Sequence, residues 1–267
     1  MPCSAAEDPG LTAALTSAFE AVQDGLDLLV PDDLKRGDTR IRLGAGFGAL
    51  PDYKGSDDYR LKALPLIDIR YRRRWRLGYN RLSYGAFMPG NWEVGPFLKY
   101  TGGRKESRNP ALLGFGNIGA TAELGLFARY RTDRMLFNVE ARHALGADQG
   151  ESVRISFGHA LYKNGDFALG AVARAKWRSA AAMRTTFGIT PAQASRSQTG
   201  LAVYTPGAGI SGVSVDVIAR YRLSERHRLM ALASYGRIVG DAARSPLVAA
   251  EGSRGQLKIG FGFTIDF

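Results

Sequence analysis

The chain has 267 residues and carries 36 Lys and Arg against 25 Asp and Glu, a formal net charge of +11. With 45% apolar residues it is too hydrophobic for a disordered chain, and its single cysteine excludes a disulfide framework and any multi-cysteine metal site. No apolar run of about 18 residues occurs, which excludes a helical membrane span.

Residues 1–38 differ from the rest and are predicted to form an N-terminal extension. Apolar residues recur there at steps of four and three: Leu15, Phe19, Val22, Leu26 and Leu29. This spacing predicts an amphipathic helix over about 9–30. Asp8 and Pro9 suit its start, and Pro31 suits its end. We expect the helix to pack on the domain, or to serve as a plug or a periplasmic docking element.

From residue 39 to the end the hydrophobic period is two, which is typical of β-strands. In the segment 118–131, for example, Leu124 and Leu126 share one face, whereas Glu123 and Arg129 share the other. Eleven such segments can be counted, at about 39–50, 59–71, 74–84, 92–101, 118–131, 134–142, 152–162, 167–178, 213–223, 226–237 and 256–267. Asn164-Gly165 is a strong signal for a two-residue hairpin turn.

Three features favour a membrane barrel over a soluble one. The segments are longer than most strands and suit a transmembrane strand of about 9–11 tilted residues. Short and long connections alternate, as they do in outer-membrane barrels. Aromatic residues lie near many segment ends, as in interfacial girdles: Tyr71, Trp75, Trp92, Tyr100, Tyr130, Tyr162, Trp177, Tyr221, Tyr235 and Phe267.

The predicted fold is therefore an all-β, transmembrane, antiparallel up-and-down barrel over residues 39–267, with the N-terminal helix attached. Because bacterial single-chain barrels have even strand numbers, we expect twelve strands, with ten as the alternative. The weakest stretch is 72–91, where Arg72, Arg73 and Arg74 follow one another. The expected surroundings are outer-membrane lipid and lipopolysaccharide.

The end of the chain carries a candidate signal for the barrel-assembly machinery. Phe263, Ile265 and the terminal Phe267 alternate along the last segment. A closing strand with a terminal aromatic residue is the usual mark of a bacterial outer-membrane barrel. The first ten residues include Glu7 and Asp8 but no Lys or Arg, so an intact secretory signal is not predicted. We expect that signal to have been removed or to be missing.

The charged faces of the segments are predicted to point into the lumen. They comprise nine basic and four acidic residues: Glu93, Lys99, Glu123, Arg129, Glu140, Arg142, Arg154, Arg174, Lys176, Asp216, Arg220, Arg222 and Lys258. Unpaired buried ions cost several kcal/mol each, so these groups must pair across strands or face water. An open lumen of this composition would favour anions weakly, whereas a paired network would close it.

Several long motifs resemble the MipA/OmpV family of outer-membrane proteins. They are residues 50–60 (LPDYKGSDDYR), 64–68 (LPLID), 109–114 (NPALLG), 187–194 (FGITPAQA) and 245–248 (SPLV), together with the end at Phe267. The resemblance runs from about residue 40 to 267. It implies an outer-membrane β-barrel without enzymatic activity, catalytic residues or a cofactor. One member of the family is described as a scaffold between a lytic murein transglycosylase and a penicillin-binding protein, so both are candidate partners.

The remaining motifs favour structural interpretations. Gly114–Gly119 fits G-x-G-x-x-G, but a strand follows instead of the helix that a dinucleotide site needs. His143 and Ser156 are the most suggestive hydrolase pair, yet they belong to opposite strand faces. Gly44, Gly46 and Gly48 alternate, which predicts a bend in the wall or a close approach.

One loop stands out as a candidate surface loop, with Asp52, Tyr53, Asp57 and Asp58 close together. Its oxygen atoms resemble Ca²⁺ ligands, but the spacing is not that of an EF-hand. A solvated turn, or one paired with Arg60, is favoured, and no metal is expected.

Three functions are compatible with the sequence. The preferred one is a scaffold or interaction protein for peptidoglycan-remodelling enzymes. The alternative is a porin-like small-solute channel with weak anion preference. A soluble, basic β-domain that binds nucleic acid is disfavoured, because the Arg residues alternate with apolar residues instead of clustering.

Overall fold

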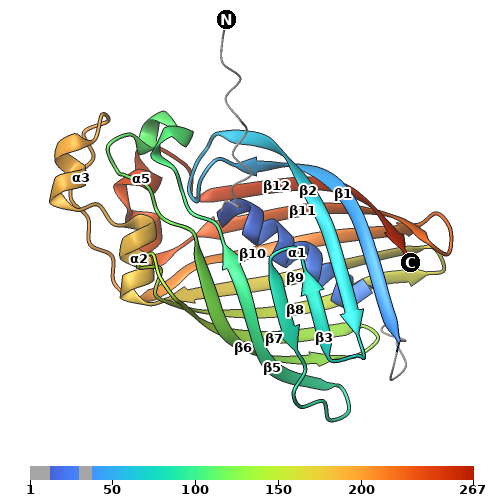
Figure 1. The fold of residues 1–267 in the computed structure, drawn as a ribbon. Helices are drawn as coiled ribbons and strands as arrows, with labels where there is room; N and C mark the ends of the chain where they lie inside the picture. The colour runs from blue at the N-terminus through green and yellow to red at the C-terminus, as the bar shows by residue number, and fades with distance from the viewer. Residues whose placement is uncertain (1–12, 30–37) are drawn as a thin grey trace, which may run out of the picture.

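The computed structural model describes residues 13–29 and 38–267, and its twelve antiparallel strands close into a barrel around a helix (Figure 1). Each strand pairs with the next one in the chain, and the first pairs with the last. The strands are β1 (Thr39–Pro51), β2 (Tyr59–Tyr71), β3 (Trp75–Gly78), β4 (Arg81–Tyr84), β5 (Trp92–Thr101), β6 (Thr121–Arg131), β7 (Met135–Ala144), β8 (Glu151–Asn164), β9 (Phe167–Arg178), β10 (Gly209–Arg222), β11 (His227–Ile238) and β12 (Gly255–Asp266). The prediction of a twelve-stranded barrel is confirmed.

One predicted strand is wrong, and its correction supplies the missing twelfth strand. The segment 74–84 is a hairpin of two four-residue strands, β3 and β4, instead of one strand. Arg72 and Arg73 adopt the left-handed conformation, with φ of 51° and 59°, and turn the chain before β3. Neither is Gly or Asn, so the sequence carries no ordinary signal for this turn.

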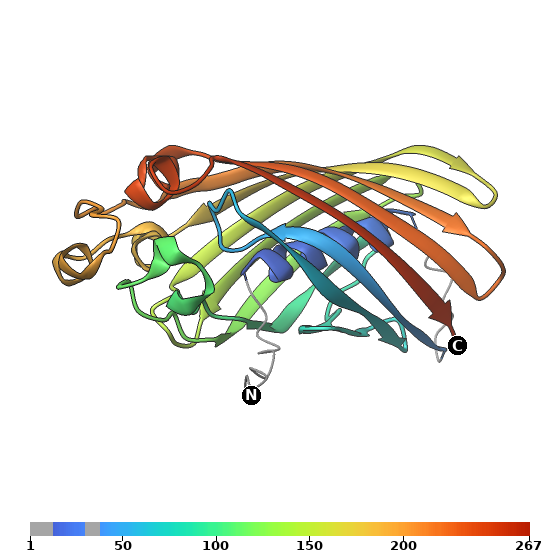
Figure 2. The ribbon, with the colours of Figure 1, turned by 90° about the horizontal axis from the view of Figure 1, so that it is seen from above.

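The two ends of the barrel differ (Figures 1 and 2). At the short-turn end the connections are 72–74, 85–91, 132–134, 165–166 and 223–226. At the long-loop end they are 52–58, 102–120, 145–150, 179–208 and 239–254. The long loops carry short helices that were not predicted from the sequence: η1 (Glu106–Arg108), η2 (Pro110–Leu112), α2 (Ala180–Phe187), α3 (Pro191–Arg196), α4 (Gly240–Arg244) and α5 (Pro246–Ala249). They pack around buried side chains such as Leu112, Phe187 and Leu247.

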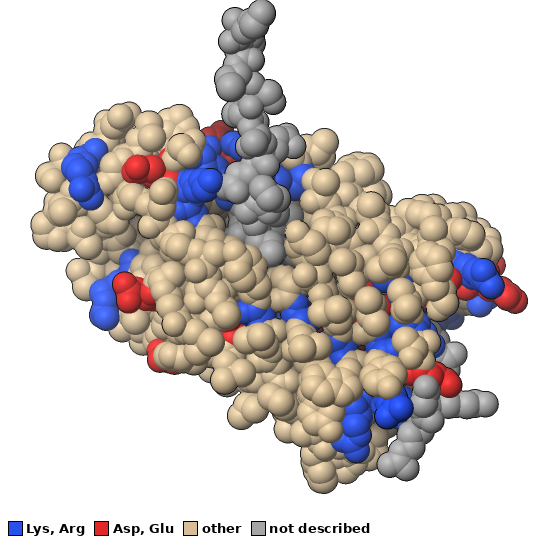
Figure 3. Space-filling model, in the orientation of Figure 1, with Lys and Arg blue, Asp and Glu red and all other residues tan. Residues whose placement is uncertain are grey.

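The outer wall of the barrel is apolar. Leu124, Leu126 and Phe261 point outward and are 54%, 64% and 52% exposed. Most of the face in Figure 3 is uncharged; Lys, Arg, Asp and Glu lie at both ends of the barrel, and a row of Lys and Arg is visible across the middle of the face. An apolar band flanked by charged ends matches a barrel whose outside contacts lipid. Among the described residues, no helix is long and apolar enough to cross a membrane.

Aromatic side chains border this band at both ends. Near the short-turn end, the rings of Trp75 and Tyr84 pack at a tilt with centroids 4.7 Å apart, and the ring centroids of Trp92 and Tyr130 lie 5.1 Å apart. Near the long-loop end, Trp177 is 38% exposed on the outer wall. Such paired rings sit favourably at the boundary between hydrocarbon and headgroups.

The barrel closes where β1 meets β12. Gly46 faces Gly262 across this seam, and a Cβ atom on Gly46 would collide with the carbonyl oxygen of Phe261. The alternating glycines of β1 therefore serve a close approach of two backbones. At the chain end, the amide of Phe267 donates to the carbonyl of Ile41 at 2.8 Å, while its ring is 70% exposed.

Helix α1 (Ala13–Leu29) lies inside the barrel, where it contacts strands β1 and β7–β10 (Figure 2). This position matches the plug among the alternatives predicted for it. Its C-terminal half packs Leu26, Leu28 and Leu29 against inward apolar residues of the wall, which are Leu136, Ala160, Ala168, Val172, Ile218, Met230 and Leu232. Parts of the predicted helix lie outside the described part of the chain. They are its two ends, at residues 9–12 and 30, the flanking residues Glu7, Asp8, Pro9 and Pro31, and the side chains of Leu15 and Phe19.

Candidate functional site

Three carboxylates of α1 form the centre of the lumen. Glu20, Asp24 and Asp27 are spaced by four and three residues, so they share one helical face. Asp24 and Asp27 are only 2% and 1% exposed. The prediction for this helix used its apolar residues and missed its row of acidic residues. Two signals could have revealed that row: the spacing of the three carboxylates, and the nine predicted lumen cations, for which the same prediction supplied only four acidic partners.

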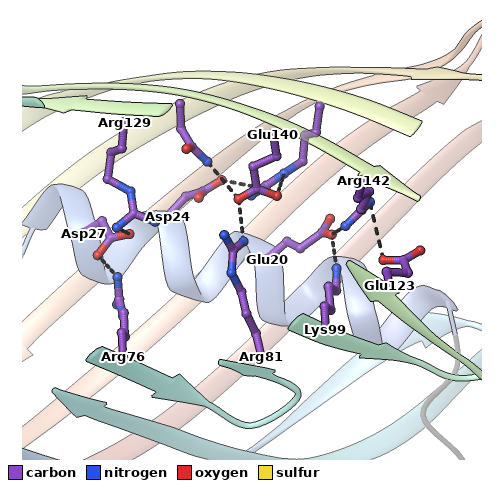
Figure 4. Close-up of polar contacts among 12 residues, drawn as sticks. Glu20, Asp24, Asp27, Arg76, Arg81, Lys99, Glu123, Arg129, Glu140 and Arg142 are labelled. Atoms are coloured by element: carbon purple, nitrogen blue, oxygen red, sulfur yellow. Dashed lines mark hydrogen bonds and ion pairs between the residues drawn. The ribbon is translucent and has the colours of Figure 1, made fainter. Parts of the chain in front are cut away.

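Asp27 holds the barrel wall near the hairpin β3–β4. Its carboxylate accepts from Arg70 at 3.1 Å. It also accepts from Arg76, and Arg129 lies 3.5 Å away (Figure 4). Asp68 of β2 completes the cluster by accepting from Arg76 at 2.8 Å. Three arginines from β2, β3 and β6 thus converge on one helix residue.

Asp24 joins the opposite wall to the helix. It accepts from Arg154 of β8 and from Arg174 of β9, both at 2.8 Å. Arg154 also donates to Glu140 at 2.8 Å, and Glu140 accepts from Arg81 across the lumen (Figure 4). Because Arg81 comes from the β3–β4 hairpin, this chain of ion pairs spans the barrel beside the helix.

Glu20 forms the third cluster, nearest the long loops. It accepts from Lys99 of β5 and from Arg142 of β7, the latter at 2.8 Å. Arg142 also lies 3.4 Å from Glu123 and donates to Ser152 at 2.9 Å. The helix is therefore tied to the wall at three successive levels.

The other predicted lumen residues lie at four different positions. Glu93 accepts from Arg129 at 3.3 Å, and Asp216 accepts from Arg174, so both belong to the network. Lys176 and Lys258 line a cavity on the long-loop side of Glu20. Arg220 lies near the short-turn end, and Arg222 lies exposed at the rim, where it pairs with Asp166 at 2.8 Å. Arg222 is thus outside the central lumen.

This arrangement makes α1 a tightly held plug. Removing one partner from a buried ion pair leaves an unpaired charge, which costs about 3–5 kcal/mol. Each carboxylate of α1 has at least two cationic partners. If the helix left the lumen, several buried charges would therefore lose their partners at once. The lumen is therefore blocked by a helix, and the charged residues of the wall hold that helix in place.

The candidate surface loop serves packing. Asp52 and Tyr53 are buried, whereas Asp57 and Asp58 are exposed. Asp52 pairs with Arg60 at 2.9 Å, and the Tyr53 hydroxyl donates to the carbonyl of Glu251 at 2.8 Å. Burial raises the pKa of Tyr53 above its ordinary value. Tyr53 belongs to the cluster under the long loops instead of a surface site.

The structure brings together no catalytic group from the hydrolase-like and glycine-rich motifs in the described part of the chain. His143 points outward and pairs with Glu151 at 3.0 Å, whereas Ser156 is fully buried on the inner face. Gly114 and Gly116 lie in a loop with positive φ ahead of strand β6. Within residues 13–29 and 38–267, no group of three His, Cys, Asp or Glu side chains is placed to hold a metal ion.

One family of known proteins matches most of this chain. The model of one family, described as MltA-interacting protein MipA, matches residues 43–267. No curated protein matches the chain. Among solved structures, the KdgM porin in complex with disordered oligogalacturonate has a TM-score of 0.45 and 10% identity, with 85% of this chain and 99% of that chain covered. The NanC porin has a TM-score of 0.42 and 9% identity, with the same coverage.

Proposed function

The chain belongs to the MltA-interacting protein MipA family and is a β-barrel of the bacterial outer membrane, and from this premise we propose that it is a non-enzymatic scaffold for peptidoglycan-remodelling enzymes. The observation that carries the proposal is the plugged lumen. A barrel whose central lumen is occupied by α1 and its ion pairs is suited to present its ends to partners. The family name supplies the partner class, a lytic transglycosylase, and a penicillin-binding protein is the expected second partner.

The short-turn end is the proposed docking surface. Short turns of outer-membrane barrels face the periplasm, where peptidoglycan enzymes work. Exposed basic residues gather in these turns, among them Arg72, Arg73, Arg134 and Arg226. The exposed acids nearby include Asp133, Asp166 and Glu225, of which Asp166 is paired with Arg222. This basic rim would attract an acidic face of the partner enzyme.

Co-purification tests the scaffold. The tagged barrel should recover a lytic transglycosylase from envelope extracts, and Arg72→Glu/Arg73→Glu/Arg226→Glu should reduce that recovery at least about fivefold, because reversed charge repels an acidic partner. The matched control is Arg184→Glu/Arg196→Glu/Arg244→Glu, which reverses three exposed cations of the long loops and should leave recovery unchanged. If no peptidoglycan enzyme is recovered above an unrelated outer-membrane barrel, the scaffold proposal fails.

The second candidate is a small-solute channel with weak anion preference. The excess of cations on the lumen wall favours it, because such a wall attracts anions. Conduction would require α1 to leave its three clusters of ion pairs. This function therefore depends on displacing the plug, and neutralising the carboxylates of α1 is the change that would release it.

A further inference from the structure

The cavity that Lys176 and Lys258 line lies between the plug and the long loops. Its volume is about 200 Å³, and its lining joins inner-wall residues of β9 and β12 to residues of the loops. Glu20 lies on its lining, and Ala182 of α2 and Lys54 of the first long loop border it on the loop side. We name this space the vestibule. The plug separates it from the short-turn end.

The vestibule is strongly basic. Ten Lys and Arg residues line it, against three acids, Glu20, Asp52 and Glu123. All three acids already have basic partners, since Glu20 and Glu123 pair with Arg142 and Asp52 pairs with Arg60. Arg154 and Arg174 pair in addition with Asp24, Glu140 and Asp216 of the plug network. The cations of the lining that form no ion pair among the described residues include Lys54, Arg104, Lys176 and Arg178.

Two of the cations lie against one buried ring. Lys54 Nζ lies 5.6 Å from the centroid of Phe187, and the guanidinium carbon of Arg178 lies 5.8 Å from the same centroid. Burial and the charges of Arg178 and Lys258 lower the pKa of Lys54. Burial likewise lowers the pKa of Arg104, to about 10. Like charges that share a buried space destabilise one another, and an anion bound among them would relieve this repulsion.

Hydrogen-bonding capacity is also left over at this site. The Nε atoms of Arg104 and Arg178 and the Oγ1 atom of Thr101 are buried and have no hydrogen-bond partner among the described residues. All three residues line the vestibule. Unused donors beside uncompensated positive charge are the features by which proteins recognise phosphate and carboxylate oxygens.

We propose that the vestibule is a binding site for a soluble, multivalent oxyanion that carries phosphate or carboxylate groups. A soluble ligand fits better than a membrane lipid, because the cations of β9 and β12 alternate with outward apolar residues such as Trp177 and Leu257. The barrel wall thus lies between these cations and the surrounding lipid. The site faces the long-loop end and does not depend on the proposed scaffold function.

Calorimetry with sodium tripolyphosphate tests the site in the full-length protein, held in a zwitterionic detergent. One molecule should bind per chain, and the affinity should fall as NaCl is raised, because salt screens charge pairing. Lys54→Gln/Lys176→Gln should weaken binding about tenfold or more, since each removed cation contributes on the order of 1 kcal/mol. Arg134→Gln/Arg226→Gln removes the same charge at the short-turn end and should bind within about twofold of the original protein.

Two further arms distinguish the alternatives. Tripolyphosphate should raise the melting temperature of the unmodified protein more than NaCl of equal ionic strength does, because a ligand of the folded state stabilises it. Affinity should also be the same in nanodiscs of zwitterionic lipid with and without lipopolysaccharide. No binding, equal weakening by both double variants, or binding that disappears when lipopolysaccharide occupies the membrane would overturn the proposal.

Discussion

Neutralising the three carboxylates of α1 is expected to turn a silent barrel into a conducting one. In Glu20→Gln/Asp24→Asn/Asp27→Asn, the arginines that now bind the helix would lose their acidic partners on α1. The acids of the wall that remain are too few to balance them, so the arginines would repel one another. The helix is then expected to leave the lumen, because among its described side chains only Ala21, Val22, Leu26, Leu28 and Leu29 belong to the apolar cluster that would still hold it. Planar-bilayer recording should show no steps for the original protein and anion-selective steps for the triple variant.

A charge-matched control separates this effect from a general change in net charge. Asp57→Asn/Asp133→Asn/Glu225→Gln removes three exposed acids outside the lumen. This variant should stay as silent as the original protein. Equal conductance in the original protein and the plug variant would contradict a lumen closed by α1, and steps in the original protein would favour the channel function.

Placing an arginine on the outer wall is expected to destabilise the protein strongly. Leu126 lies in the middle of β6, points outward and is 64% exposed. In water, Leu126→Arg would cost little, but at the middle of a bilayer it should cost about 2–4 kcal/mol of unfolding free energy. Urea unfolding in phospholipid vesicles measures this difference. The control is Leu223→Arg, which lies in a short turn and should cost about 1 kcal/mol or less.

Most of the fold could be predicted from the alternation of polar and apolar residues along the strands. Glu123 and Arg129 alternate with Leu124 and Leu126, and this period of two predicted both the strand and the two environments of its faces. The even strand number came from a general property of barrels and not from the local sequence. The one misread strand, 74–84, failed because Arg72 and Arg73 turn the chain without a residue that favours positive φ.

The contents of the lumen were harder to predict, because they depend on contacts between distant parts of the chain. Asp24 meets Arg174 across 150 residues, and Asp27 meets Arg70 across 43. Strand periodicity also assigned the inner face to charged residues, yet Ile218 lies on that face and is 1% exposed. It is apolar because it packs on the helix, and only the position of the helix explains it.

The central claim is that α1 occupies the lumen against strand β10, and disulfide trapping tests it most directly. A Cβ atom on Gly25 would lie 3.2 Å from the Cβ atom of Ile218, close enough for Gly25→Cys/Ile218→Cys to form a bridge with slight adjustment. Cys3→Ser removes the native thiol from both variants tested. The control pair, Gly25→Cys/Val217→Cys, places the second thiol on the outer wall.

The measurement is maleimide labelling after oxidation and denaturation. We expect the Gly25–Ile218 pair to be protected from labelling until a reductant is added, and the Gly25–Val217 pair to react fully. Full labelling of both pairs would show that the helix does not reside in the barrel, and it would contradict a lumen plugged by α1.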